Sequence, residues 1–125
     1  MKWIYKRLRR PSCSIEKFKC EKEMSDYNFG IHRGLKILKF FKKQRIKLQK
    51  SFVLDIGCGR GGIDIAFSSF CQRIIAGDID IEGLKVAKAR FKARRIKNID
   101  LIRLDGSNLP FKPGIFRLVI INGVL

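Results

Sequence analysis

The chain has 125 residues, of which 46% are apolar, so it is long enough and apolar enough to fold as one domain rather than stay disordered. No apolar run approaches the roughly 20 residues that span a bilayer, and we expect no transmembrane segment. The formal net charge of +17 would attract phosphate groups and is compatible with nucleic acid or an anionic lipid surface as a partner, although a solvated basic face needs no ligand.

The four cysteines give no sign of a metal site. Their spacings fit no zinc template, and the single histidine, His32, is not at ligand spacing from a cysteine pair. The charged N-terminus is not followed by an apolar stretch, so it makes a poor signal peptide. We therefore expect a cytoplasmic protein without a metal site, in which these four are reduced thiols: Cys13, Cys20, Cys58 and Cys71.

The first 30 residues are a basic lead-in with few periodic signals, and we expect one domain over residues 31–125. A helix is predicted over residues 31–49, with Gly30 at its start, because apolar residues recur there at helical spacing while lysines face largely away. The apolar stripe of this helix consists of Ile31, Leu35, Leu38 and Phe41.

Short apolar strands then alternate with helices. Strands are predicted over residues 52–56, 73–77, 99–104 and 116–121. Helices are predicted over residues 63–70 and 81–95, the second with Asp80 as its N-cap and with Leu84, Ala87 and Phe91 as its apolar stripe. This alternation predicts βαβ units, a parallel sheet and right-handed crossovers.

A glycine-rich loop follows the first predicted strand. Gly57, Gly59 and Gly62 fit the G-x-G-x-x-G spacing, and glycine allows a tight turn that a ligand approaches closely. Two ligand classes use such a loop: dinucleotides, whose pyrophosphate lies at the helix N-terminus, and S-adenosylmethionine. Both place ribose near an acid that ends the second strand, and Asp78, which lies 21 residues after Gly57, is in position for that role.

Residues 53–62 resemble motif I of class I S-adenosylmethionine-dependent methyltransferases, most closely the broad group that includes small-molecule and quinone-precursor methyltransferases. Asp55, two residues before the first glycine, is typical of that family, whereas dinucleotide-binding proteins usually have an apolar residue there. The resemblance implies that Asp55 helps to hold the loop and the methionine end of the cofactor, with Cys58 inside the same loop.

The next two motifs of the family follow in order. Residues 76–84 are similar to motif II, which implies that Asp78 binds ribose and that Ile79 lies beside the cofactor. Residues 104–111 resemble the motif after it, in which Asp105 would accept a hydrogen bond from the adenine amino group and the amide of Gly106 would meet a ring nitrogen.

Residues 116–125 resemble motif IV, which implies a cofactor-binding position for Asn122. The family usually has Asp where this chain has Arg117, a departure at the outer end of the motif. Enzymes that methylate adenine or amide nitrogens typically show an Asn/Asp-Pro-Pro-Tyr/Phe segment here, and residues 122–125 lack it. This counts against methylation of nitrogen in DNA bases or glutamine. The methyl acceptor is otherwise unidentified, with a small molecule among the candidates, and no general base can be named.

Together these features predict an α/β domain with a Rossmann-like three-layer αβα architecture. Its parallel sheet would have about four strands in the order 3-2-1-4, against seven in the complete methyltransferase fold. We expect the front, cofactor-binding part of a longer enzyme, or a chain whose partner supplies the missing strands. Two alternatives stay open: an NAD-type oxidoreductase domain, and a non-catalytic basic module of the same fold that binds RNA or membrane.

Overall fold

The computed structural model describes residues 20–122, with side chains from residue 29 onward. Its strands form one sheet and are β1 (Phe52–Ile56), β2 (Arg73–Asp78), β3 (Ile99–Arg103) and β4 (Leu118–Ile121). They lie in the order β3-β2-β1-β4, and every neighbouring pair is parallel. The predicted α/β class, the Rossmann-like parallel sheet and its strand order are therefore confirmed. The predictions for Cys13, the Cys20 thiol and residues 123–125 lie outside the described part.

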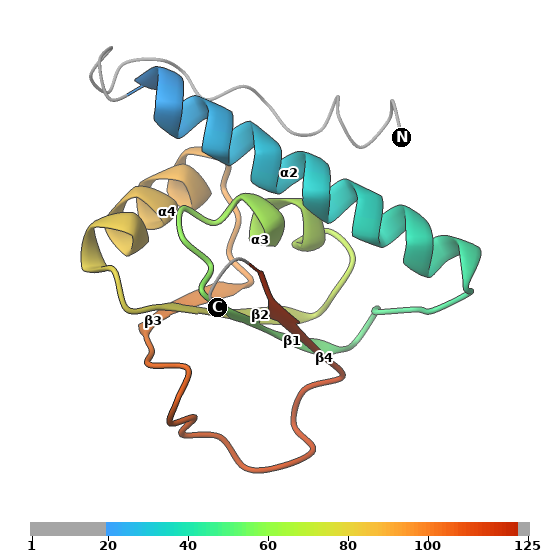
Figure 1. Ribbon diagram of the computed structural model, residues 1–125. Coiled ribbons are helices and arrows are strands. Elements are labelled where there is room, and N and C mark those ends of the chain that lie inside the picture. Colours follow the sequence, from blue (N-terminus) through green and yellow to red (C-terminus); the bar gives the residue numbers. More distant parts are fainter. Residues whose placement is uncertain (1–19, 123–125) are drawn as a thin grey trace.

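Three helices lie on one face of this sheet, as Figure 1 shows, and they are α2 (Cys20–Lys43), α3 (Gly62–Phe67) and α4 (Ile81–Ala93). The long loop between β3 and β4 runs on the opposite side (Figure 1). Its Phe111 and Phe116 rings meet edge to face with centroids 5.0 Å apart and pack against the cluster of Leu54, Ile56 and Leu104. Within residues 20–122, the second face is thus covered by a loop and not by the helical layer that was predicted.

The helix predicted over residues 31–49 was wrong at both ends, because α2 runs from Cys20 to Lys43. The expected division between residues 30 and 31 falls inside it. Gly30 does not begin the helix but lets it approach α3, since a Cβ there would lie 3.1 Å from the Gly62 Cα. At the other end the chain turns through Arg45, which has a left-handed φ of 58°, and the Ile46 amide donates to the Phe41 carbonyl at 2.9 Å.

The predicted apolar stripes form the core between the helices and the sheet. From α2, Ile31, Leu35 and Leu38 are buried, and Phe41 packs against them while partly exposed. From α4, the buried residues are Gly83, Leu84, Ala87 and Phe91. Asp80 caps α4 as predicted, since its side chain accepts a hydrogen bond from the Glu82 amide at 3.1 Å. Among the described residues, no helix has both the length and the apolar character needed to cross a membrane.

Candidate functional site

The loop between β1 and α3 is held in a backbone conformation that favours glycine. Gly57, Gly59 and Gly61 have φ values of 78°, 55° and 77°, in the left-handed region where a side chain is strained. The amides of Gly57 and Cys58 both donate to the Gly77 carbonyl of β2, at 2.8 and 3.0 Å. A Cβ on Gly59 would meet nothing within 4 Å. The loop is thus fixed to the sheet on one side and open at Gly59 on the other.

The third glycine of the predicted pattern has a different role from the one expected. Gly61, not Gly62, adopts the left-handed conformation and is the N-cap of α3. A Cβ on Gly61 would lie 2.4 Å from the Phe91 ring of α4, whereas Gly62 begins α3 beneath α2. Gly61 was not among the candidate residues predicted from the sequence. The sequence contained a sign of this role, because residues 57–62 hold four glycines, whereas the G-x-G-x-x-G pattern needs only three of them.

Asp78, at the end of β2, ties the glycine loop to the next turn. Its Oδ2 accepts a hydrogen bond from the Gly59 amide at 2.7 Å, and its Oδ1 accepts one from the Asp80 amide at 2.9 Å. A carboxylate offers about four acceptor positions, so further donors can still be bound. The neighbouring Ile79 side chain is 63% exposed, which places apolar surface beside these acceptors.

Asp55 and Asp64 form a buried pair directly behind the loop. Asp55 comes from β1 and Asp64 from the first turn of α3, and each is only 1% exposed. Burial raises the pKa of Asp55 to about 7, opposed by a hydrogen bond from Asp64 and reinforced by the charge of Asp78. Burial also raises the pKa of Asp64, and the charge of Asp55 raises it further. The hydrogen bond between two carboxyl groups requires a proton on one of them, and these shifts place it on Asp64.

Asp64 was not among the residues predicted from the sequence, although the sequence contains a sign of it. It is the one polar residue in the apolar stretch 63–67, and a polar side chain in a buried helix requires a partner. What the spacing could not show is that the partner is Asp55, because the two face each other only once α3 packs on the sheet.

The Cys58 side chain points into the core rather than toward the open side of the loop. It is 9% exposed and belongs to the main hydrophobic cluster. Burial, followed by the nearby charge of Asp64, raises the pKa of this thiol far above its usual range, so it stays protonated. Among the described side chains, no group of three His, Cys, Asp or Glu residues is arranged to hold a metal ion.

Asp105 and Gly106 follow β3 at the same edge of the sheet. The Oδ1 of Asp105 accepts from both the amide and the hydroxyl of Ser107, at 2.9 and 2.8 Å, which leaves its other oxygen without a bond from this turn. The hydrogen bond from the Ser107 amide holds the pKa of Asp105 below its usual value, so it is an ionised acceptor. Both residues are exposed.

Asn122 directly follows β4 and is contacted from α2. Its Oδ1 accepts a hydrogen bond from the Arg33 guanidinium, which also lies over the Phe29 ring at 4.4 Å from the centroid. Arg33 was not a candidate in the sequence analysis, and no spacing could have indicated a contact across 89 positions. Through it, α2 reaches the end of β4.

All ten predicted cofactor residues lie near the carboxyl ends of the strands, in the glycine loop or, for Gly62, at the first position of α3. The strand order reverses between β1 and β4, and in open α/β sheets ligands bind outside the carboxyl ends at such a reversal. The residues are Asp55, Gly57, Cys58, Gly59, Gly62, Asp78, Ile79, Asp105, Gly106 and Asn122.

Comparison with known proteins identifies the family of the chain. Residues 53–125, more than half of the chain, match the family described as a methyltransferase domain. The chain belongs to this methyltransferase-domain family. No curated protein sequence matches it.

Solved structures share the fold. The YcgJ protein from Bacillus subtilis is 27% identical with a TM-score of 0.63, over 72% of this chain and 37% of that one. PKMT2 from Rickettsia typhi, solved in complex with AdoHcy, is 25% identical with a TM-score of 0.54, over 62% of this chain and 15% of that one. A SAM-dependent methyltransferase from Aquifex aeolicus, 21% identical with a TM-score of 0.59 over 70% and 46%, shows the fold alone. The chain thus spans less than half the length of each.

Proposed function

We propose that the site binds S-adenosylmethionine and that the chain is the cofactor-binding part of an enzyme that transfers a methyl group to an acceptor. Membership of the methyltransferase-domain family supports this proposal, as does the position of the candidate residues where the strand order reverses. The observation that carries it is the negative charge gathered behind and beside the glycine loop.

This charge comes from Asp78 and from the pair of Asp55 and Asp64, which shares one proton. Both lie close enough to the Cys58 thiol inside the loop for their negative charge to raise its pKa. S-adenosylmethionine carries a positive sulfonium and an ammonium group, whereas a dinucleotide brings a doubly negative pyrophosphate to such a loop. Since a charge of one sign in a partly buried site attracts the opposite sign and repels its own, this loop favours the sulfonium cofactor over NAD.

The described residues fit the parts of that cofactor. The open backbone at Gly59 allows the methionine part to pass close to the loop, with the Asp55 carboxyl behind it. We assign the free acceptor positions of Asp78 to the ribose hydroxyls and the open oxygen of Asp105 to the adenine amino group. The exposed Ile79 side chain offers apolar surface to the base, and Asn122 borders the site from β4.

When bound, the cofactor supplies a methyl group that its sulfonium has already activated for displacement. The contribution of this chain is to bind and orient, and positioning of this kind is worth about 7–11 kcal/mol in well-arranged reactions. The acceptor is unidentified, a small molecule is one candidate, and none of the described acids is assigned as a general base.

Calorimetry on the purified chain tests the cofactor assignment. We expect S-adenosylhomocysteine to bind with at least tenfold higher affinity than NAD. Tighter binding of NAD would contradict the assignment and favour an oxidoreductase domain. The matched control is Asp100→Ala, which removes a carboxylate that pairs with Arg73 at the surface near the opposite edge of the sheet and should leave the affinity unchanged.

Location and further partners are also proposals. A cytoplasmic location is supported by Cys58 and Cys71, which form no disulfide, and cell fractionation tests it. Contact with nucleic acid or anionic lipid is supported only by the basic charge, including the exposed Lys36, Lys39 and Lys43 of α2. Such contact predicts binding that weakens steeply with added salt.

A further inference from the structure

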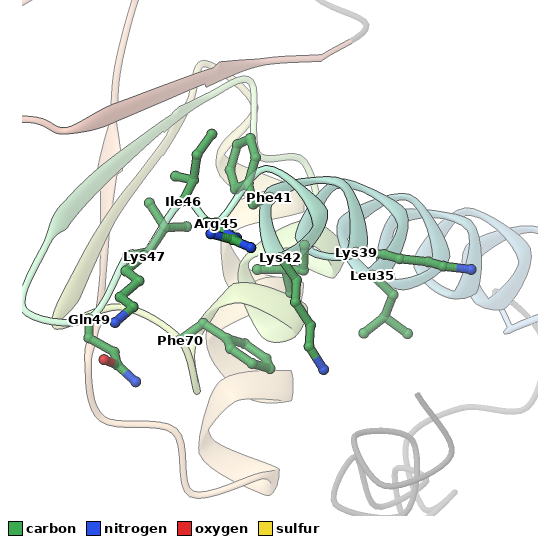
Figure 2. A pocket seen from close by; sticks show the side chains of 11 residues that line it. Leu35, Lys39, Phe41, Lys42, Arg45, Ile46, Lys47, Gln49 and Phe70 are labelled. Atoms are coloured by element: carbon green, nitrogen blue, oxygen red, sulfur yellow. The ribbon is translucent and has the colours of Figure 1, made fainter.

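A cavity lies at the opposite end of β1 from the glycine loop. It has a volume of about 760 Å³ and is lined by the C-terminal half of α2, by the loop that leads into β1 and by Phe70 beyond α3 (Figure 2). This volume falls within the roughly 300–1,000 Å³ of typical small-molecule sites. The loop enters β1 at the amino end of that strand, whereas the glycine loop leaves it at the carboxyl end. The cavity and the glycine loop therefore lie at opposite ends of the strands of the sheet.

The floor of the cavity is apolar and fixed in the core. Leu35, Leu38 and Leu48 are buried, and Phe41 and Phe70 pack against the same cluster. The Phe41 ring meets the fully buried Phe67 ring edge to face, with centroids 6.4 Å apart. Because this floor belongs to the packed core, it offers a preformed surface to an alkyl chain, whose transfer from water is favourable in proportion to the area buried.

The rim of the cavity is basic. Lys39 and Lys42 extend from α2, and Arg45 and Lys47 come from the loop after it (Figure 2). All four are exposed. Among the described residues, none that lines the cavity is acidic, and none of these four forms an ion pair with a carboxylate. A site with an apolar floor and four cations at its mouth complements a molecule that is apolar at one end and negatively charged at the other.

We propose that this cavity binds a single-chain amphiphile with an anionic head group, taken up as a free monomer such as a fatty acid. The N-terminal residues 1–19 of this chain are a poor match for it, since they hold seven Lys or Arg residues and one Glu and would meet a rim of the same charge. The bound molecule is not the methyl acceptor, because the cavity and the glycine loop are at opposite ends of the strands of the sheet.

Titration calorimetry with dodecanoate, on the 125-residue chain and below micelle-forming concentrations, tests the proposal. We expect saturable binding of one molecule, at least tenfold weaker binding of dodecanol or dodecyltrimethylammonium, and unchanged affinity for S-adenosylhomocysteine. Along the series octanoate, decanoate and dodecanoate, each added methylene should tighten binding about threefold to fourfold, which corresponds to about 0.8 kcal/mol. Equal binding of dodecanol would overturn recognition of the head group.

Two double variants that reverse charge distinguish binding at the cavity from general electrostatic attraction between dodecanoate and the basic surface. Lys39→Glu with Lys42→Glu should weaken dodecanoate binding at least tenfold, since it reverses two cations of the rim. The matched control, Lys36→Glu with Lys88→Glu, makes the same change in net charge at exposed positions outside the lining and should alter affinity less than twofold. Equal losses in both pairs would overturn the proposal.

A spectroscopic map and a vesicle assay complete the test. Amide NMR shifts on adding dodecanoate should be concentrated at Ile46, Leu48 and Phe70 and absent from residues 57–62. Shifts at the glycine loop instead would place the ligand elsewhere and overturn the assignment.

A vesicle assay tests for contact with a membrane surface. Binding to phosphatidylglycerol vesicles without any binding of monomeric dodecanoate or dodecyl phosphate would identify such a contact and would also overturn the proposal.

Discussion

The carboxyl groups of Asp64 in α3 and Asp55 in β1 are neighbours inside the core directly behind the glycine loop, close enough to share a hydrogen bond, and as carboxylates neither oxygen of Asp64 has a partner among the described residues. Such a bond exists only while the pair holds a proton. Two ionised carboxylates at this place would repel each other without water to screen them. The stability of the domain and the shape of the loop are thus linked to the protonation of this pair.

The first prediction is that stability falls as the pH rises. Burial raises the pKa of Asp55 from 3.8 to about 7 and raises that of Asp64 as well. Above pH 3.8 the unfolded chain releases protons that the folded chain keeps, so the folded state loses stability as the pH rises through about 7. The loss is about 1.4 kcal/mol per pH unit for each retained proton. Urea unfolding between pH 4 and pH 8 measures it.

Asp64→Asn is the informative variant for this pair. An amide can still donate to Asp55 but cannot ionise, so the dependence of the unfolding free energy on pH should become flatter. Asp100→Asn, at a half-exposed position, serves as the control and should keep the steep decline. If Asp64→Asn also kept the steep decline of unfolding free energy with pH, the proton would not be shared between Asp55 and Asp64.

The second prediction concerns Asp78, whose carboxylate holds the Gly59 and Asp80 amides. Asp78→Ala removes both hydrogen bonds and the proposed ribose acceptor. Because a hydrogen bond to a charged group is worth roughly 1.5–3 kcal/mol, the affinity for S-adenosylhomocysteine should fall about tenfold to a hundredfold. Calorimetry measures the change.

Asp80→Ala distinguishes cofactor binding from helix capping. Asp80 accepts from the Glu82 amide at the start of α4, so its loss should cost about 1 kcal/mol of stability and leave affinity within about twofold. Unchanged affinity in Asp78→Ala together with a large loss in Asp80→Ala would move the ribose role to Asp80.

The third prediction concerns the contact between α2 and α3. A Cβ on Gly34 would lie 2.7 Å from the Ala66 Cβ, so Gly34→Ala should destabilise the domain by about 1–3 kcal/mol through overpacking, despite the better helix propensity of alanine. Ala66→Gly should relieve the clash, and the double variant should be more stable than the sum of the single effects predicts. Additive effects in thermal unfolding would show that the helices do not approach this closely.

The fourth prediction concerns Arg33 and Asn122, the contact between α2 and the end of β4. Arg33→Ala and Asn122→Ala should each destabilise the domain, and the double variant should cost less than their sum by about 0.5–2 kcal/mol, as expected of residues in direct contact. Chemical unfolding of the four proteins measures this coupling. Lys36→Ala combined with Asn122→Ala is the control pair and should show none.

The sequence by itself determined the elements and their order. The spacing of apolar residues predicted all four strands and α4 to within about two residues. The spacing of the motifs predicted that Asp55, Asp78 and Asp105 lie at the carboxyl ends of the strands. These features can be read from the chain because strand alternation and helical stripes are local patterns, and because parallel strands joined by helices put every carboxyl end on the same side.

Only the tertiary structure decided which side chains meet. The pairing of Asp55 with Asp64, the contact of Arg33 with Asn122 and the approach of Gly61 to Phe91 each join segments that no repeat or spacing connects. The ends of α2 were decided in the same way, because Gly30 is tolerated inside the helix where it packs against Gly62. The physical reason is that close packing selects among residues by shape and distance in three dimensions, whereas the sequence patterns describe only neighbours along the chain.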